Sequence, residues 1–347
     1  MVKKIVQLII FLGLGVFFIW LSVKGLKQED LEIIKISVKG ILNSNSMLFI
    51  FISIICGIIS HYFRALRNIL LIDPLGYKVR KTTAFYSVMS CYLTNLAIPR
   101  FGEVFRCTFL QRYDKIPFQK SFGTVVVERG FDLLIFAVLF VLIIFLNKEL
   151  LSELIINKQK GITLGMMIEE KWAALWAMKY LALIALVALI AIILIIKHIK
   201  QKIKSKPSKI IGIVKNIMVG LWQGLISIKD LQHPYLFIIY TIVIWVFYYL
   251  GVLFCFFAFD FLQHLGPMPA FMVLVVGAIG FMVAQGGLGA YPLIVAGVLA
   301  LYGVDYAQGL AAGWIGWSAQ TIMILIVGFT TLILASFLKI EDRKIDK

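Results

Sequence analysis

The chain has 347 residues, of which 61% are hydrophobic and 15% are charged, and it carries a net charge of +16 at pH 7. This composition excludes a water-soluble domain, because so apolar a chain would aggregate in water. Several apolar runs reach the roughly 20 residues needed to cross about 30 Å of hydrocarbon, so we predict an all-α, polytopic membrane protein. We expect residues 1–338 to form a single transmembrane domain and residues 339–347 to form a short cytoplasmic tail.

Six segments are long and apolar enough to predict full transmembrane helices. They are Ile5–Val23, Met47–Leu70, Phe118–Leu146, Trp172–Ile196, Tyr235–Phe259 and Ala312–Leu338. The first follows a short basic stretch, as the core of a signal peptide would. Its apolar run is longer than a usual signal core and no small-x-small cleavage site follows it, so we interpret it as a retained span.

Two further apolar segments are interrupted by polar residues, glycine and proline, and each predicts a re-entrant helical hairpin. In the first, Thr82–Pro99 runs to a turning point at Pro99, and Gly102–Arg112 returns as a second helix. In the second, Met268–Tyr302 breaks at Gln285–Gly289. The hairpins then enter from opposite sides of the membrane, one in each half of the chain, which fits two inverted halves. Such paired interruptions point to a substrate site near the midplane, although the symmetry rests on hydropathy alone.

The distribution of basic residues predicts the orientation. With a cytoplasmic N-terminus, most of the 34 Lys and Arg residues fall on the cytoplasmic side, as the positive-inside rule requires. We therefore expect both termini in the cytoplasm and the protein in the plasma (inner) membrane.

The strongest basic block follows the fourth predicted span. It could be a nucleic-acid patch, but in a membrane protein it is better explained as a topology anchor that also attracts anionic headgroups. We therefore expect membrane lipids, chiefly anionic ones, as partners and no nucleic acid; the sequence does not indicate an oligomeric state. The block consists of Lys197, Lys200, Lys202, Lys204, Lys206, Lys209 and Lys215.

Cysteine and histidine spacing indicates neither a disulfide framework nor a metal site. The cysteines lie in apolar surroundings without paired spacing, and the histidines are dispersed. We interpret these residues as packed or interfacial side chains, and we predict no metal and no cofactor. They are Cys56, Cys91, Cys107 and Cys255 with His61, His198, His233 and His264.

Charged residues recur at every third position after Pro99. If Pro99 is the first residue of a helix, Arg100, Glu103 and Arg106 share one broad face of that helix. The free backbone N–H groups and the positive dipole end of the helix would favour a phosphate beside Arg100. This pattern predicts a substrate-binding cluster.

A second charged cluster interrupts the third predicted span. Glu128 and Asp132 are four residues apart, and Arg129 is within reach of Asp132 on the helix surface. Counted from Phe118 at 1.5 Å per residue, Glu128 lies about 15 Å along the helix, well inside the bilayer. An ionised group at that depth is costly unless it faces protein, water or an opposite charge.

The two clusters carry opposite net charge, so we expect them to meet in a polar chamber and neutralise each other. Arg100, Glu103 and Arg106 sum to +1, and Glu128, Arg129 and Asp132 sum to −1. A purely structural ionic staple between hairpin and span is the alternative. Because apolar residues often replace a buried ion network without loss of stability, we favour a substrate site.

The run Gln285-Gly286-Gly287-Leu288-Gly289 predicts a true break in the second interrupted helix. Glycines in a membrane helix can serve close packing alone, but three in five residues exceed that need. Since such a break is tolerated only where protein or a cavity satisfies the backbone, we add Gln285, Gly286, Gly287 and Gly289 to the predicted substrate-binding residues. In the last span Trp314, Trp317 and Gln320 could line a cavity.

Taken in order, these motifs resemble the flippase-like transmembrane domain of the lysylphosphatidylglycerol synthase family. The resemblance covers roughly Met1–Leu338. In that family the membrane domain is associated with moving aminoacylated phosphatidylglycerol between leaflets, which implies lipid handling here. Only Lys339–Lys347 follow the last span, so we expect neither the family's aminoacyl-transferase domain nor synthesis of a lysyl-lipid. The motifs are Pro99-Arg100-Phe101-Gly102-Glu103 with Arg106, Glu128-Arg129 with Asp132-Leu133, and Gln285-Gly286-Gly287-Leu288-Gly289.

Our leading hypothesis is a flippase- or scramblase-like transporter of an anionic phospholipid or a polyprenyl-phosphate-linked lipid. Arg100 and Arg106 would bind the phosphate, and Glu103 would orient them. Glu128, Arg129 and Asp132 would supply the counter-charge as the headgroup crosses. The glycine break would act on the side of the opposite leaflet. The sequence has no Walker A pattern, so we expect no direct ATP drive.

Two other functions stay open. A membrane-embedded polyprenyl-phosphate glycosyl or phosphoryl transferase would use Glu103, Glu128 or Asp132 as acid, base or metal ligand, although the intermixed arginines disfavour a metal. A non-catalytic scaffold would use the charged clusters only to hold helices together.

Overall fold

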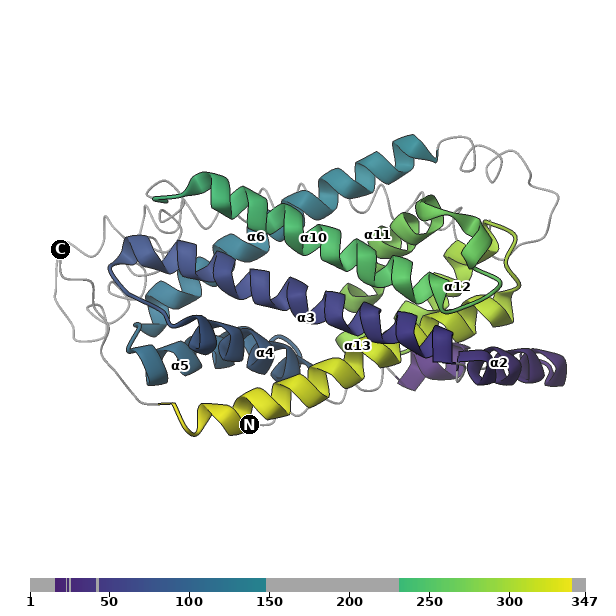
Figure 1. Ribbon diagram of the computed structural model, residues 1–347, viewed down its shortest axis with the longest axis horizontal. Coiled ribbons are helices and arrows are strands. Elements are labelled where there is room, and N and C mark those ends of the chain that lie inside the picture. The colour runs from purple at the N-terminus through teal and green to yellow at the C-terminus, as the bar shows by residue number, and fades with distance from the viewer. Residues whose placement is uncertain (1–15, 23, 25, 42–43, 148–230, 339–347) are drawn as a thin grey trace, which may run out of the picture. The chain divides into compact units, whose positions relative to one another are not determined.

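The computed structural model describes residues 16–22, 24, 26–41, 44–147 and 231–338, and the regular secondary structure in these ranges is helical (Figure 1). The chain divides into two compact units, residues 1–143 with 220–347, and residues 144–219. Of the second unit only residues 144–147 are described. Residues 144–146 complete the helix that begins at Phe118 in the first unit, and residue 147 follows it.

Four described helices are long and apolar enough to cross a membrane, and they coincide with four of the predicted spans. The all-α prediction is confirmed for the described residues, and the protein is an integral membrane protein. Residues 16–22 of the predicted first span are helical. The rest of that span, the span predicted at Trp172–Ile196 and the lysine block after it lie outside the described residues. The four helices are α3 (Ser44–Ile72), α6 (Phe118–Leu146), α10 (Pro234–Phe257) and α13 (Tyr306–Ala335).

The long helices expose large apolar side chains. Val141 on α6 is 66% exposed, Ile326 on α13 is 63% exposed and Ile242 on α10 is 57% exposed. In water these surfaces would be unfavourable, whereas in a bilayer they face hydrocarbon at no cost. Exposed apolar side chains of this kind are typical of helices that face lipid.

The first interrupted segment forms a helix–turn–helix. Helix α4 (Lys81–Ala97) packs against α5 (Gly102–Asp114), and residues 98–101 form the turn between them. The predicted turning point at Pro99 and the returning helix from Gly102 are confirmed, whereas the interpretation of Pro99 as a first helical residue is wrong, because Pro99 lies in the turn. Asn95 explains this boundary: its side-chain oxygen accepts a hydrogen bond from the Gly102 N–H at 2.7 Å, which satisfies a free donor of the α5 N-terminus.

The base of this hairpin is closed by an ion pair. Arg80, directly before α4, contacts Asp114 at the end of α5 at 2.8 Å, and Asp114 is fully buried. Arg80 also donates to the Tyr113 carbonyl at 3.1 Å. The two ends of the hairpin are thus fastened to each other.

The second interrupted segment is also two helices joined by a break, as predicted. Helix α11 (Pro267–Val283) is followed by the short helix η4 (Gln285–Gly287) and by α12 (Ala290–Ala300). Gly286, Gly287 and Gly289 have φ angles of 59°, 73° and 69°. Residues with a side chain rarely adopt such positive φ angles, which explains why glycine occupies these positions.

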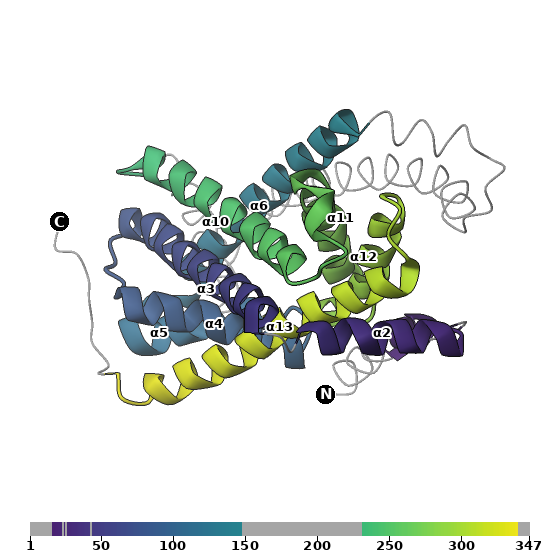
Figure 2. The same cartoon turned by 45° about the vertical axis from the view of Figure 1, so that its right-hand side comes forward.

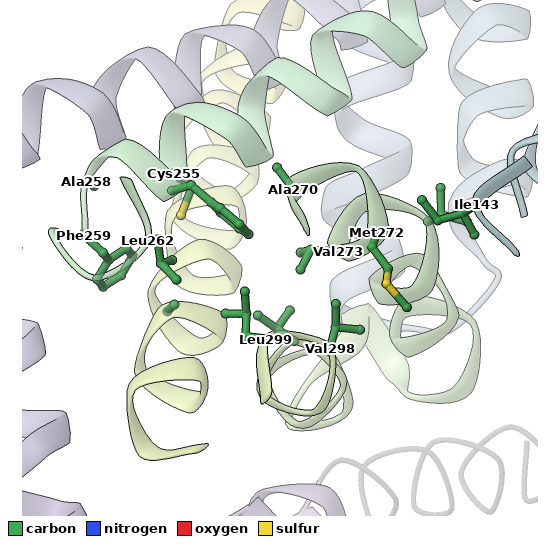
Figure 3. Packing of buried hydrophobic residues seen from close by; sticks show 14 residues of the cluster. Ile143, Cys255, Ala258, Phe259, Leu262, Ala270, Met272, Val273, Val298 and Leu299 are labelled. Carbon is green, nitrogen blue, oxygen red and sulfur yellow. The ribbon is translucent and has the colours of Figure 1, made fainter. Parts of the chain in front are cut away.

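Small residues bring α11, α12 and α13 together. A Cβ atom at Gly280 of α11 would lie 2.8 Å from the Tyr291 Cα, and one at Gly313 of α13 would lie 2.7 Å from the Pro292 Cα. Backbones therefore approach as closely as small-residue packing in membranes allows. Figure 3 shows the apolar core that results, where Val298 and Leu299 of α12 lie near Val273 of α11.

The two hairpins lie toward opposite ends of α3, which itself packs along α10 (Figures 1 and 2). Their interrupted regions nevertheless meet: the Gln285 amide donates to the Leu96 carbonyl, near the end of α4, at 2.7 Å. The break of one hairpin thus rests on the turn end of the other. The remaining described elements are α2 (Gln28–Ile41), η1 (Asp73–Leu75) and η3 (Gln263–Leu265).

Candidate functional site

The charged residues predicted for the site lie on the first hairpin and on α6, and they form three groups of ion pairs. In the first group, Asp132 on α6 accepts hydrogen bonds from two arginines of α3. Arg64 binds one carboxylate oxygen, and Arg67 binds the other at 2.8 Å. Both arginine side chains are buried, with exposed fractions of 6% and 0%. Two cations thus share one carboxylate.

Helix α10 completes this group with neutral acceptors. Arg64 donates to the Tyr248 hydroxyl and Arg67 donates to the Thr241 hydroxyl, each at 3.1 Å. The Nε atoms of both arginines are buried without a hydrogen-bond partner. The group therefore joins α3, α6 and α10, and it retains unused donors.

The second group is a two-contact pair between α5 and α6. Arg106 donates to both carboxylate oxygens of Glu128, at 2.8 and 3.3 Å. Both side chains are almost wholly buried. Parallel contacts of this kind are among the strong ones in proteins, and they occupy both terminal nitrogens of the guanidinium.

The third group is partly exposed. Arg129 of α6 contacts Glu103, in the first turn of α5, through one nitrogen at 2.7 Å, and their side chains are 43% and 21% exposed. Asn95 donates weakly to the other Glu103 oxygen at 3.5 Å. Glu103 is thus bound by donors from two different helices, Arg129 of α6 and Asn95 of α4.

Arg100 departs from the prediction. It lies in the turn, exposed, with a φ of 57°, and not on the face of α5 that carries Glu103 and Arg106. Within the described ranges no carboxylate lies within ion-pair distance of it. The prediction that all three residues share a helix face is wrong for Arg100, because the turn extends through residue 101 before the helix begins.

The expected meeting of the two clusters is confirmed, because Arg106–Glu128 and Glu103–Arg129 both join α5 to α6. The partners of Asp132 were missed. Arg64 and Arg67 lie three residues apart inside the predicted span Met47–Leu70, so the argument from intramembrane charge applies to them equally.

His61, one turn before Arg64, was treated as an isolated histidine. It is buried, with its ring 4.3 Å from that of Tyr92, and its Nδ1 has no partner. It belongs to the same polar region.

Counting these residues changes the charge of the site. The paired set contains four arginines (64, 67, 106 and 129) and three carboxylates (103, 128 and 132), so its formal charge is 4 − 3 = +1. The mutual cancellation expected from the sequence is therefore incomplete, and positive charge is in excess.

The glycine break is held in place by side chains from other elements. Trp317 of α13 donates to the Gly286 carbonyl at 2.7 Å, while Gln285 reaches Leu96. A Cβ at Gly289 would lie 2.6 Å from the Ile19 N atom. Gln320 of α13 donates to the Ser53 carbonyl of α3 at 3.3 Å. Gln285, Gly286 and Gly289 thus lie at a junction of elements, and Gln285 and Gly286 contact Leu96 near the end of α4.

No group of three His, Cys, Asp or Glu side chains in the described part of the chain could hold a metal ion. Each carboxylate of the ion-pair groups faces at least one arginine, a setting that favours anions over cations.

Comparison with known proteins gives one match. A family model described as "Lysylphosphatidylglycerol synthase TM region" matches residues 4–328. No curated protein and no solved structure matches the chain.

Proposed function

Because the chain belongs to the family of the lysylphosphatidylglycerol synthase transmembrane region, whose membrane proteins have lipid-related functions, we propose that it moves an anionic lipid between leaflets. The cargo is an anionic phospholipid or a polyprenyl-phosphate-linked lipid. The proposed route uses the arginine groups for the headgroup and the exposed apolar helix sides for the acyl chains.

The observation that carries this proposal is the excess of arginine inside a membrane protein. Buried charges are costly in a membrane and call for an opposite charge, yet the paired set keeps a formal charge of +1. A headgroup phosphate would supply the missing anion. A scaffold needs no such excess, because equal numbers of both charges would hold the helices as well.

The architecture adds support. Two interrupted helical segments meet at the Gln285–Leu96 contact, and interrupted helices of this kind are a feature of membrane transport sites. We propose that both segments are re-entrant hairpins entering from opposite sides. We further propose one transmembrane domain over residues 1–338, both termini in the cytoplasm, and residence in the plasma (inner) membrane.

Leaflet exchange in liposomes tests the proposal. The purified chain is reconstituted with a trace of fluorescent phosphatidylglycerol, phosphatidic acid or phosphatidylcholine, and a membrane-impermeant quencher reports the lipid that moves to the outer leaflet. We expect faster exchange of the anionic lipids than in protein-free vesicles. Exchange at the protein-free rate for every anionic lipid, including a polyprenyl phosphate, would refute transport.

A matched pair of variants separates transport from a scaffold role. Arg129→Gln removes the accessible cation of the site, whereas Arg112→Gln removes an exposed arginine of α5 that lies outside the ion-pair groups. The proposal predicts that only the first variant slows exchange while both remain folded.

A further inference from the structure

The three ion-pair groups differ in how easily a ligand can reach them. The exposed fraction is 6% or less for the side chains of Arg64, Arg67 and Arg106, and it is 43% for Arg129. Arg129 is thus the paired arginine that a headgroup can reach without opening the buried core of the site.

The Glu103–Arg129 contact is also the simplest of the three to replace. It joins one nitrogen to one oxygen, whereas Arg106 binds Glu128 through two nitrogens and Asp132 is bound by two arginines. Exposed single-contact ion pairs contribute about 0–1 kcal/mol. A charged ligand of similar size can therefore compete for Arg129.

Glu103 has other partners if it loses Arg129. It lies in the first turn of α5, where the helix dipole favours a negative charge. Asn95, the residue that caps Gly102, also donates to it. The carboxylate can stay ionised in place while the guanidinium turns to another anion.

From these contacts we propose that Arg129 is an exchangeable phosphate ligand: an anionic headgroup phosphate displaces Glu103 from Arg129, while the other two ion-pair groups stay closed as the frame of the site. The inference rests on the proposed function for the nature of the ligand, and it specifies which arginine binds. It also replaces Arg106 in that role, since Arg106 is almost wholly buried and holds Glu128 through two contacts.

Charge counting selects the class of phosphate. The paired set carries +1, which comes from the group of Arg64, Arg67 and Asp132, whereas Arg106–Glu128 and Arg129–Glu103 are each neutral. A phosphodiester with a single negative charge at Arg129 therefore brings the whole set to zero, with the displaced Glu103 included in the count. Phosphatidylglycerol-type headgroups fit this requirement. Phosphatidylcholine, whose own cation neutralises its phosphate, would add no net charge and should bind less well.

The exchange predicts an unusual sign for one substitution. Glu103→Gln removes the competitor while leaving Arg129 in place, so binding of short-chain phosphatidylglycerol to the full-length protein in detergent should tighten about two- to fivefold. Arg129→Gln should weaken binding at least about tenfold, because a charge-assisted contact is lost. Arg112→Gln is the matched control and should leave the Kd within twofold (about the spread expected for a surface change).

If the Glu103–Arg129 ion pair only holds α5 against α6, Glu103→Gln should lower the thermal stability and leave lipid binding unchanged or weaker. That result would overturn the inference. Should Glu103→Gln not fold, Glu103→Asp keeps the charge but shortens its reach, and it should tighten binding in the same direction by less. Short-chain phosphatidylcholine and inorganic phosphate are the other ligands. Binding of inorganic phosphate as tight as that of the lipid would show that the site recognises free phosphate and not a headgroup.

The same measurements separate this inference from the proposed function. Tighter binding by Glu103→Gln without leaflet exchange in liposomes would uphold the exchange at Arg129 and refute transport. Leaflet exchange by the wild-type protein with no gain in binding by Glu103→Gln would uphold transport and refute the exchange. Absence of lipid binding by the wild-type protein would refute both.

Discussion

The two hairpins have the same outline and opposite chemistry. The α4–α5 hairpin is fastened at its base by Arg80–Asp114 and joined to α6 by Arg106–Glu128 and Glu103–Arg129. The segment from Pro267 to Ala300, which contains α11 and α12, has no Asp, Glu, Lys, Arg or His. It packs through glycines, alanines and the apolar core shown in Figure 3.

This difference separates the residues that stabilise a hairpin from the residues that are available for function. The α11–α12 hairpin holds a broken helix among the other helices by small apolar residues and neutral hydrogen bonds, without charged side chains. The α4–α5 hairpin carries charges in addition, and in the function proposed above a polar ligand uses them. Four substitutions probe this contrast.

The largest effect is expected where two cations depend on one anion. Asp132→Ala leaves Arg64 and Arg67 buried with only neutral acceptors, and breaking a buried pair typically costs about 3–5 kcal/mol. We expect a strongly lowered unfolding temperature in detergent. A decrease in unfolding temperature no larger than that of Arg112→Gln would show that the Asp132 group does not stabilise the fold.

The apolar hairpin should instead be sensitive to added volume. Gly280→Ala places a methyl group 2.8 Å from the Tyr291 Cα, and overpacking of this kind typically costs about 1–3 kcal/mol. Gly40→Ala is the control, because nothing lies within 4 Å of its added Cβ. Equal unfolding temperatures for the two variants would contradict the close packing of α11 against α12.

The contact between the hairpins should matter less. Gln285→Ala removes the hydrogen bond to the Leu96 carbonyl, and a typical loss is about 1 kcal/mol. We also expect faster hydrogen exchange of the backbone around residues 285–289, measured by mass spectrometry. Unchanged hydrogen exchange at residues 285–289 would mean that the Gln285 hydrogen bond is not needed to hold the break.

The smallest effect on stability is expected at the accessible pair. Arg129→Gln should lower the unfolding free energy by about 1 kcal/mol or less, because a partly exposed ion pair contributes little. Its effect on ligand binding should be much larger, as proposed above. Denaturant titration gives the loss of unfolding free energy, and the binding measurement gives the loss of binding free energy. Comparable values for Arg129→Gln would indicate a purely structural role.

Periodicity and composition predicted the membrane helices well. A run of about 20 apolar residues has few alternatives in a bilayer, so α3, α6, α10 and α13 appear where expected. The glycine break was equally predictable, since three positive φ angles fall on Gly286, Gly287 and Gly289.

The pairing of charges was predicted only in part. Helical spacing shows which residues share a face, and it brought Arg106 and Glu128 into one site. It does not show which two helices adjoin, so the α3 partners of Asp132 depended on packing between distant segments. The returning helix was predicted to begin at Gly102, as α5 does, but the side-chain cap that Asn95 provides there was not, because Asn95 lies seven residues away on the other helix.

The backbone of Arg100 adds a last point about the turn between α4 and α5. A non-glycine residue at a φ of 57° is strained by about 1–2 kcal/mol, since its Cβ crowds the following carbonyl. Glycine would relieve that strain and would also remove an exposed cation from the turn. Under the predicted role of Arg100 as a phosphate ligand, local backbone stability and anion binding favour different residues at this position.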